Sequence, residues 1–189
     1  MFVMASTETS ETQHTLAQWL AREASVQATL NSGIGCAAVP RAQALAMDGL
    51  ALMHAMLEGR APFPPIGQTL GFTLIEVDAG HAVFQGTPGA GHLNPLGTVH
   101  GGWYATLLDS AMGCAIHTRM PAGRAYTTAE LSVNLVRAML PGKPVRVRAE
   151  GQVIHCGRQL ATAEARLVGP DGTLYAHGTT TCLVFDAPT

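Results

Sequence analysis

NPLGTVHGG, at residues 94–102, runs into a segment with helical periodicity whose single carboxylate is Asp109. A glycine pair at the start of a helix leaves backbone N–H groups unpaired and positively polarised. Histidines aside, Asp109 is the only charged side chain between residues 93 and 117. Backbone donors that bind an oxyanion, together with one carboxylate, are the minimal equipment for attacking a carbonyl group. This stretch therefore predicts an acyl-transfer or hydrolysis site.

Strand patterns surround the expected helix, which covers about residues 100–118. Before the helix, alternation of apolar and polar residues predicts a hairpin of residues 72–77 and 81–85. After the helix, the same alternation predicts strands at residues 129–135, 145–150, 161–167 and 173–185. Nothing in the connections suggests a parallel crossover. The pattern therefore predicts an α+β fold, with an antiparallel sheet packed on one central helix.

Residues 1–48 lie outside this pattern and are expected to form an N-terminal tail and helical extension, before a main domain at residues 49–189. The polar residues 1–13 are expected to be a disordered tail. Apolar periodicity predicts helices at residues 15–30 and 43–58, with a glycine-containing break between them.

The predicted central helix has two distinct faces when its residues are placed at intervals of about 100°. The apolar face, which is expected to pack on the sheet, contains Tyr104, Leu107, Leu108, Ala111 and Ala115. The opposite face is a stripe of small residues around the carboxylate: Gly102, Thr106, Asp109 and Gly113. A solvated face would normally carry longer polar side chains. The stripe therefore predicts the close approach of a ligand or of a partner subunit.

The composition limits the classes of protein that fit the chain. Its 189 residues and 47% hydrophobic content are typical of one compact domain with an appendage. Only 13% of the residues are charged, against about a quarter in typical globular chains, which predicts surface hidden in an oligomer. The net charge of −2 gives no indication of nucleic-acid binding.

Cofactor and membrane signals are not found in the sequence. The histidines lack metal-ligand spacing, and no phosphate-binding loop or dinucleotide fingerprint is present, so we expect neither a metal nor another cofactor. No apolar run approaches the roughly 20 residues that span a membrane, and the first residues do not resemble a signal peptide. The cysteines form no CxxC pair, which fits reduced thiols. We therefore expect a soluble, cytoplasmic protein.

The arrangement of these residues resembles a known family signature. The pattern N-x-x-G-x-x-H-G-G-x-x-x-x-x-L-D-x-x-x-G is similar to that of the PaaI-type branch of the hotdog-fold acyl-CoA thioesterases. In this chain it contains Asn94, Gly97, His100, Gly101, Gly102, Leu108, Asp109 and Gly113. The resemblance extends from about residue 49 to residue 185 and includes the order of the strands. It implies a hotdog fold, in which the sheet wraps around the central helix, and hydrolysis of an acyl-CoA thioester.

The resemblance also implies roles for individual residues. The Gly101 N–H would polarise the thioester carbonyl, and Asp109 would act as general base for water or as the nucleophile. Asn94 would bind the attacking water or help to hold the carboxylate region. Thr128 matches a position that orients water, although strict strand alternation groups Thr128 with the polar Glu130 unless the start of the strand is irregular.

Helix geometry adds a constraint on this site. Gly101 and Asp109 are eight residues apart, so they lie about 12 Å apart along the helix axis. One carbonyl group cannot easily contact both from the same subunit, whereas a two-fold pairing of antiparallel helices joins one subunit's Asp109 to the other's Gly101. In similar enzymes the two groups come from different subunits. We therefore expect a homodimer with shared active sites, assembled further into a homotetramer as a dimer of dimers.

Two other functions are open at this point. A hydratase or dehydratase of acyl thioesters would use Asp109 and His100 as base and acid, and the plainer alternative is that His100 caps the helix. A non-catalytic acyl-CoA-binding protein would keep the site without turnover. Arg158 and Gly157, at a predicted hairpin turn, are candidates for binding the CoA phosphates, and a solvated arginine in a simple turn is the alternative. The sequence does not indicate which acyl group is bound.

Overall fold

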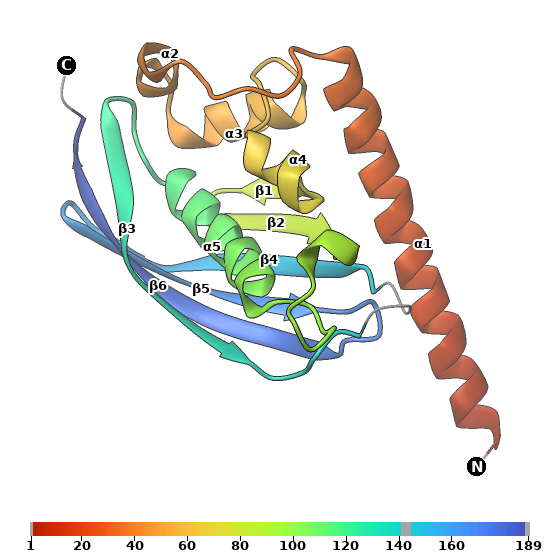
Figure 1. The fold of residues 1–189 in the computed structure, drawn as a ribbon. Coiled ribbons are helices and arrows are strands. Elements are labelled where there is room, and N and C mark those ends of the chain that lie inside the picture. Colours follow the sequence, from red (N-terminus) through yellow and green to blue (C-terminus); the bar gives the residue numbers. More distant parts are fainter. Residues whose placement is uncertain (1, 141–144, 188–189) are drawn as a thin grey trace.

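A curved antiparallel sheet wraps around the helix that begins at the glycine pair (Figure 1). The structure, a computed structural model, describes residues 2–140 and 145–187. In this part of the chain, six strands follow the spatial order β1-β2-β4-β5-β6-β3, and every neighbouring pair is antiparallel. The strands are β1 (Phe72–Asp78), β2 (His81–Gly86), β3 (Arg124–Leu135), β4 (Val147–Cys156), β5 (Leu160–Val168) and β6 (Leu174–Asp186). The predicted α+β fold, with an antiparallel sheet around one central helix, is confirmed.

The central helix α5 (Gly101–His117) buries its apolar face against the sheet. No member of the predicted face is more than 2% exposed: Tyr104, Leu107, Leu108, Ala111 and Ala115. β4 approaches the helix closely at Gly151, where a Cβ atom would lie 2.4 Å from the Ala111 carbonyl oxygen. Burial of this face contributes about 25 cal/mol for each Å² of apolar surface removed from water, so it fixes how α5 sits in the sheet.

Two strands differ from their predicted bounds for the same reason. β4 continues to Cys156 rather than ending at residue 150, with a bulge at Ile154. β3 begins at Arg124 rather than at residue 129, with a bulge at Ala129. A bulge interrupts the alternation of apolar and polar side chains. Because this alternation is what predicts a strand from the sequence, the predicted strand stops at the bulge.

The predicted disordered tail is wrong over its described residues, because helix α1 spans Phe2–Ser32 and includes the predicted helix at residues 15–30. No glycine or proline occurs within residues 2–32, so a helix anchored by its packed middle continues without a break. Among the described residues, neither α1 nor any other helix combines the length and hydropathy that a membrane crossing requires. The domain boundary between residues 48 and 49 stays a prediction.

Short helices follow α1: α2 (Arg41–Ala46), α3 (Gly49–Leu57) and α4 (Pro65–Leu70) before the sheet, and a 3-10 turn (Ala90–His92) after β2. The single helix predicted at residues 43–58 is therefore wrong. Asp48 separates α2 from α3 and caps α3, because its carboxylate accepts a hydrogen bond from the Ala51 N–H at 2.9 Å. Gly49 lies against the end of α5, where a Cβ atom would be 1.7 Å from the His117 carbonyl oxygen. Close packing on α5 thus fixes where α3 begins.

α1 runs along one side of the molecule (Figure 1), and it contacts β1, β2 and β4 on the face that is turned away from α5. The Arg22 guanidinium donates two hydrogen bonds to the Ile75 carbonyl, at 2.9 and 3.1 Å. The Arg148 guanidinium of β4 lies over the Trp19 ring, 4.6 Å from its centroid. Ile75 is the bulged residue of the edge strand β1, so α1 occupies a carbonyl that another strand would otherwise pair with.

Candidate active site

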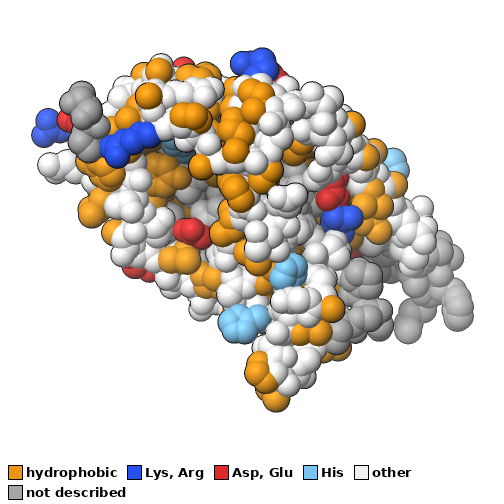
Figure 2. Space-filling model, turned by 45° about the horizontal axis from the view of Figure 1, so that its top comes forward, with side chains coloured by type: hydrophobic (Ala, Val, Ile, Leu, Met, Phe, Trp, Pro, Cys, Tyr) orange, Lys and Arg blue, Asp and Glu red, His pale blue; other side chains and the backbone are white. Residues whose placement is uncertain are grey.

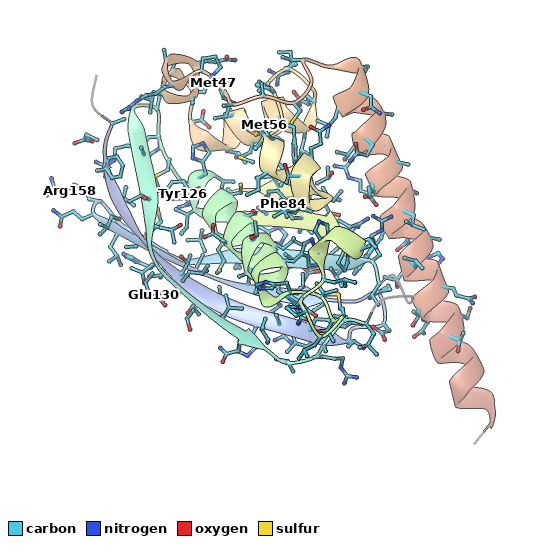
Figure 3. The ribbon with its side chains drawn as sticks, viewed as in Figure 1. Met47, Met56, Phe84, Tyr126, Glu130 and Arg158 are labelled. Carbon is cyan, nitrogen blue, oxygen red and sulfur yellow. The ribbon has the colours of Figure 1, made fainter. Side chains whose placement is uncertain are left out.

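Asp109, in the middle of α5, meets Thr128 of β3. The Thr128 hydroxyl donates a hydrogen bond to the Asp109 carboxylate, with 3.3 Å between Oγ1 and Oδ1. Because of the bulge at Ala129, Thr128 shares the inner side of the sheet with Leu131, while Glu130 lies on the outer side (Figure 3). The role that the resemblance implies for Thr128 requires an irregular strand start, and the bulge supplies it.

Asp109 borders an apolar cavity of about 210 Å³, which we call the acyl cavity. Its walls include Phe63, Pro64, Ile66, Gly67, Phe72, Phe84, Cys114 and Tyr126. Burial raises the pKa of Asp109 above its ordinary value, and the hydrogen bond from Thr128 opposes this rise. A carboxylate with a raised pKa is a stronger base, so this position suits proton abstraction beside an apolar group.

The aromatic walls of the acyl cavity are not among the residues that the sequence predicted for the site. Phe72 and Phe84 lie on neighbouring strands and pack edge to face, with ring centroids 5.7 Å apart. Strand alternation indicates that both rings point inwards, but it does not indicate that they face Asp109. Phe63 lies in a proline-rich segment without periodicity, so no sequence signal marks it.

The small-residue stripe of α5 is partly filled by the chain itself. At Gly113 a Cβ atom would lie 3.1 Å from the hydroxyl of Tyr126, which comes from β3. Burial raises the pKa of Tyr126 well above its ordinary value, so the phenol stays neutral. Tyr126 therefore occupies part of the space beside Gly113, which also borders the acyl cavity, and the predicted approach of a ligand or partner subunit stays a prediction along the whole stripe.

The start of α5 holds a second group of predicted site residues. His100 caps the helix, because its Nδ1 accepts a hydrogen bond from the Gly102 N–H at 2.9 Å. Among the described residues, no acceptor takes the preceding N–H, that of Gly101. A Cβ atom at Gly101 would lie 2.7 Å from Leu135 Cδ1, so only glycine fits without a shift. The structure thus offers one unpaired backbone donor here and places His100 as a cap.

Asn94 organises the loop that leads into α5. Its Oδ1 accepts hydrogen bonds from the Leu96 and Thr98 N–H groups, at 2.9 and 3.2 Å. Its Nδ2 donates to the Thr98 hydroxyl at 2.7 Å. Both ends of the amide are used inside residues 94–98, so the side chain fixes the loop rather than reaching Asp109 in the same chain.

The predicted catalytic residues therefore form two separate clusters on one helix. The structure joins Asp109 to Thr128, and it joins Gly101 to His100 beside the Asn94 loop. Eight residues, or about 12 Å of helix rise, separate Gly101 from Asp109. One cluster supplies a base beside an apolar cavity, and the other supplies a donor at the positive end of a helix.

Arg158 and Gly157 lie in neither cluster. They form the tip of the β4–β5 hairpin, at one end of the sheet, where Figure 3 labels Arg158. The Gly157 N–H donates to the Leu160 carbonyl at 2.8 Å and closes the turn, while Arg124 binds the backbone carbonyl of Arg158. No described residue binds the Arg158 guanidinium, which is exposed, and its predicted phosphate contact stays a prediction.

A metal site was not predicted, and in the described part of the chain no three His, Cys, Asp or Glu side chains gather in a way that would hold a metal ion.

Comparison with known proteins gives a consistent result. Residues 96–176 match the thioesterase superfamily. The TT0310 protein from Thermus thermophilus is 32% identical over 63% of this chain and 96% of its own, with a TM-score of 0.57. A mutant of the phenylacetic acid degradation protein PaaI from the same organism is 31% identical over 63% and 97%, with a TM-score of 0.57. A hypothetical thioesterase protein from Streptococcus pneumoniae, solved with coenzyme A, is 22% identical over 65% and 93%, with a TM-score of 0.56. Among curated proteins, none matches the chain.

A sheet wrapped around a central helix, with a carboxylate and a bare helix start on that helix, defines a hotdog-fold thioester hydrolase. The chain belongs to the thioesterase superfamily and, within it, to the PaaI-type hotdog thioesterases. The resemblance seen in the sequence is confirmed, and so is the hotdog fold that it implied.

Proposed function

We propose that this protein hydrolyses an acyl-CoA thioester to the free acid and CoA. The observation that carries the proposal is the Asp109 carboxylate, whose pKa burial raises and which Thr128 holds beside the apolar acyl cavity. An acyl chain in that cavity brings its thioester carbonyl next to the base. The streptococcal thioesterase protein solved with coenzyme A supports CoA as the carrier.

In the proposed reaction Asp109 is the general base. It removes a proton from a water molecule, whose oxygen attacks the thioester carbonyl carbon. The carbonyl oxygen becomes an oxyanion, which the Gly101 N–H stabilises at the positive end of α5. The tetrahedral intermediate then breaks its C–S bond, and the CoA thiolate takes the proton from Asp109. Thr128 orients the carboxylate during both proton transfers.

The two clusters reach one substrate when two copies meet, so each proposed site combines Asp109 of one subunit with Gly101 of the other. The sheet supports this pairing, because β3 is an edge strand whose Leu131 and Leu135 side chains are 37% and 55% exposed. The other edge, β1, is engaged by α1. Figure 2 shows several separate groups of hydrophobic side chains and few charged ones on the face that it displays. The further assembly into a dimer of dimers stays a prediction.

Hydrolysis fits the geometry better than the acid–base pair that a hydratase would need. The Nδ1 of His100 is used to cap its own helix.

The test is thiol release from a panel of acyl-CoA esters. Asp109→Asn is expected to lower kcat by about 100- to 10,000-fold, because it removes the base while keeping the shape of the side chain. The matched control is Asp78→Asn, an exposed carboxylate at the end of β1, which should keep wild-type turnover. Normal turnover by Asp109→Asn would remove Asp109 from the mechanism. Loss or gain of an enoyl-CoA without thiol release identifies a hydratase, and binding without turnover across the panel identifies a carrier.

A further inference from the structure

We infer that Phe63 is a partition that closes the acyl cavity and sets the longest acyl group that the protein accepts. The inference rests on the proposed function and assigns a specificity-determining residue to it. It begins from a second cavity, of about 490 Å³, which we call the outer cavity. Three wall residues are common to the acyl cavity and the outer cavity: Phe63, Gly67 and Phe72. The two cavities therefore lie on opposite sides of one wall.

The wall is closed by the Phe63 ring. A Cβ atom at Gly67 would lie 2.5 Å from Phe63 Cε1 and 2.7 Å from the Phe72 carbonyl oxygen. The ring of Phe63 thus packs directly on the backbone of α4, and Phe63 is only 9% exposed. Because Gly67 has no side chain, the ring itself fills the gap, and shortening the side chain at position 63 would join the two cavities.

The partition is held in place from the N-terminal extension. The Phe63 N–H donates to the Gly35 carbonyl at 2.9 Å, and the Ala37 N–H donates to the Phe63 carbonyl at 3.1 Å. Gln27 of α1 anchors the far wall of the outer cavity by donating to the Thr73 hydroxyl at 2.7 Å. Residues 35–37 and α1 precede the segment that resembles the thioesterase family. The outer cavity is therefore a feature that the extension of this chain adds to the hotdog fold.

The two cavities differ in size and in chemistry. At about 30 Å³ for each water-sized group, the acyl cavity of about 210 Å³ holds about seven non-hydrogen atoms. Its walls are mainly apolar, whereas the outer cavity is lined by Glu23, Gln27, Asn31, Gln68 and Thr73. Arg146 and Gln85 bind the Glu23 carboxylate, but the Asn31 and Gln68 amides bind no residue in the described part of the chain. A chain that passes the partition therefore meets free amide groups, which suit a hydroxyl.

The experiment measures kcat/KM for hexanoyl-CoA, tetradecanoyl-CoA, dodecanoyl-CoA and ω-hydroxydodecanoyl-CoA. The wild-type protein is expected to favour hexanoyl-CoA strongly. Phe63→Ala should raise the ratio of tetradecanoyl to hexanoyl turnover by about tenfold or more, since a few methylenes in a fitted pocket are worth at least that factor. In the same variant the ω-hydroxy chain should exceed dodecanoyl-CoA, because its hydroxyl reaches the outer cavity. A general loosening of the fold would not produce that second preference.

A second variant fills the cavity from the other side. Gln68→Trp alone should leave hexanoyl-CoA turnover unchanged, whereas Phe63→Ala combined with Gln68→Trp should return the preference to the short chain. Phe63→Leu, a milder change, should give an intermediate ratio and replaces Phe63→Ala if the latter does not fold. An unchanged ratio in a folded Phe63 variant, or a long-chain gain that survives Gln68→Trp, overturns the partition. If the wild-type protein hydrolyses other acyl-CoA esters of the panel but none of these four, the partition is overturned, and if it hydrolyses no ester of the panel, the proposed function is overturned instead.

Discussion

The start and the middle of α5 are built in opposite ways. At the start, the predicted site groups are backbone N–H groups or side chains that bind the adjacent backbone. His100 caps the helix at Gly102, and the Asn94 side chain binds residues 96 and 98 of its own loop. In the middle, a half-buried carboxylate is held by a strand that is distant in sequence, and aromatic walls surround it. The first cluster is formed by residues that are close in sequence, and the second is formed by tertiary packing. Neither is a complete site for one carbonyl, so the contrast predicts that the clusters work in pairs across two chains.

The largest effect on activity is expected when each cluster is inactivated in a different chain. Asp109→Asn and Gly101→Pro dimers should each be almost inactive, because the first change removes the base and the second removes the backbone N–H donor at a helix position that tolerates proline. An equal mixture of the two chains should recover about a quarter of wild-type activity. Half of the dimers in such a mixture contain one chain of each kind, and each of these has one intact site out of two. Thiol release after co-expression, with dimers isolated by size-exclusion chromatography, measures the recovery.

The control for this mixture combines two variants of the same cluster. Asp109→Asn mixed with Thr128→Val should show no more than the mean activity of the two variants measured alone, because both changes lie in the same cluster and mixing restores no intact site. If mixed dimers of Asp109→Asn and Gly101→Pro form but stay inactive, the two clusters do not combine across two chains.

A smaller effect is expected from changing the middle cluster alone. Thr128→Val removes the hydrogen bond that lowers the pKa of Asp109, so that pKa should rise further. A general base must be ionised, so the acid limb of the kcat/KM profile should move to higher pH, and kcat should fall by about tenfold. Thr127→Val, at the exposed neighbouring position, is the control and should leave the profile in place. An unshifted profile in Thr128→Val would show that another group controls the acid limb.

The difference between local and tertiary contacts also explains which parts of the protein can be predicted from its sequence. The helix, its buried face and the glycine pair follow from local spacing, and the structure confirms the buried face of α5. Thr128 is ambiguous in the sequence because the bulge at Ala129 is decided by pairing with β6. The position of Phe63 in the cavity wall could not be predicted from the sequence, because it depends on hydrogen bonds to residues 35 and 37 and on packing against α4.

The N-terminal region shows the same limit. Polar residues near the start lack a helical apolar stripe, yet α1 continues through them because nothing breaks it once Trp19 and Arg22 are packed on the sheet. Near α3 the sequence predicts one helix where the structure has two. The helical pattern continues across Asp48, but Asp48 caps α3, and the contact of Gly49 with α5 fixes where α3 begins. In both places tertiary contacts override the local pattern.

A moderate effect is expected at the start of α5. Asn94→Ala removes three hydrogen bonds from the loop and should lower the free energy of unfolding by about 1–2 kcal/mol. It should lower kcat several-fold by displacing the helix start, without moving the pH profile that Asp109 sets. Denaturant unfolding and a pH series measure the two effects, and Asn134→Ala, on the exposed part of β3, is the control. A shifted profile would mean that the two clusters are not independent.

The smallest effect is expected outside both clusters, at the tip of the β4–β5 hairpin. Arg158→Ala should raise KM for acyl-CoA a few-fold with little change in kcat, because a guanidinium that binds phosphate contributes equally to the ground state and the transition state. The matched control is Arg166→Ala, which removes an exposed arginine of β5. The effect should fade as salt is added, since exposed charges are screened over about 10 Å at 0.1 M ionic strength. Equal KM values for Arg158→Ala and the wild type at low salt would leave Arg158 as a solvated turn residue and confine recognition of the substrate to the helix clusters and the acyl cavity.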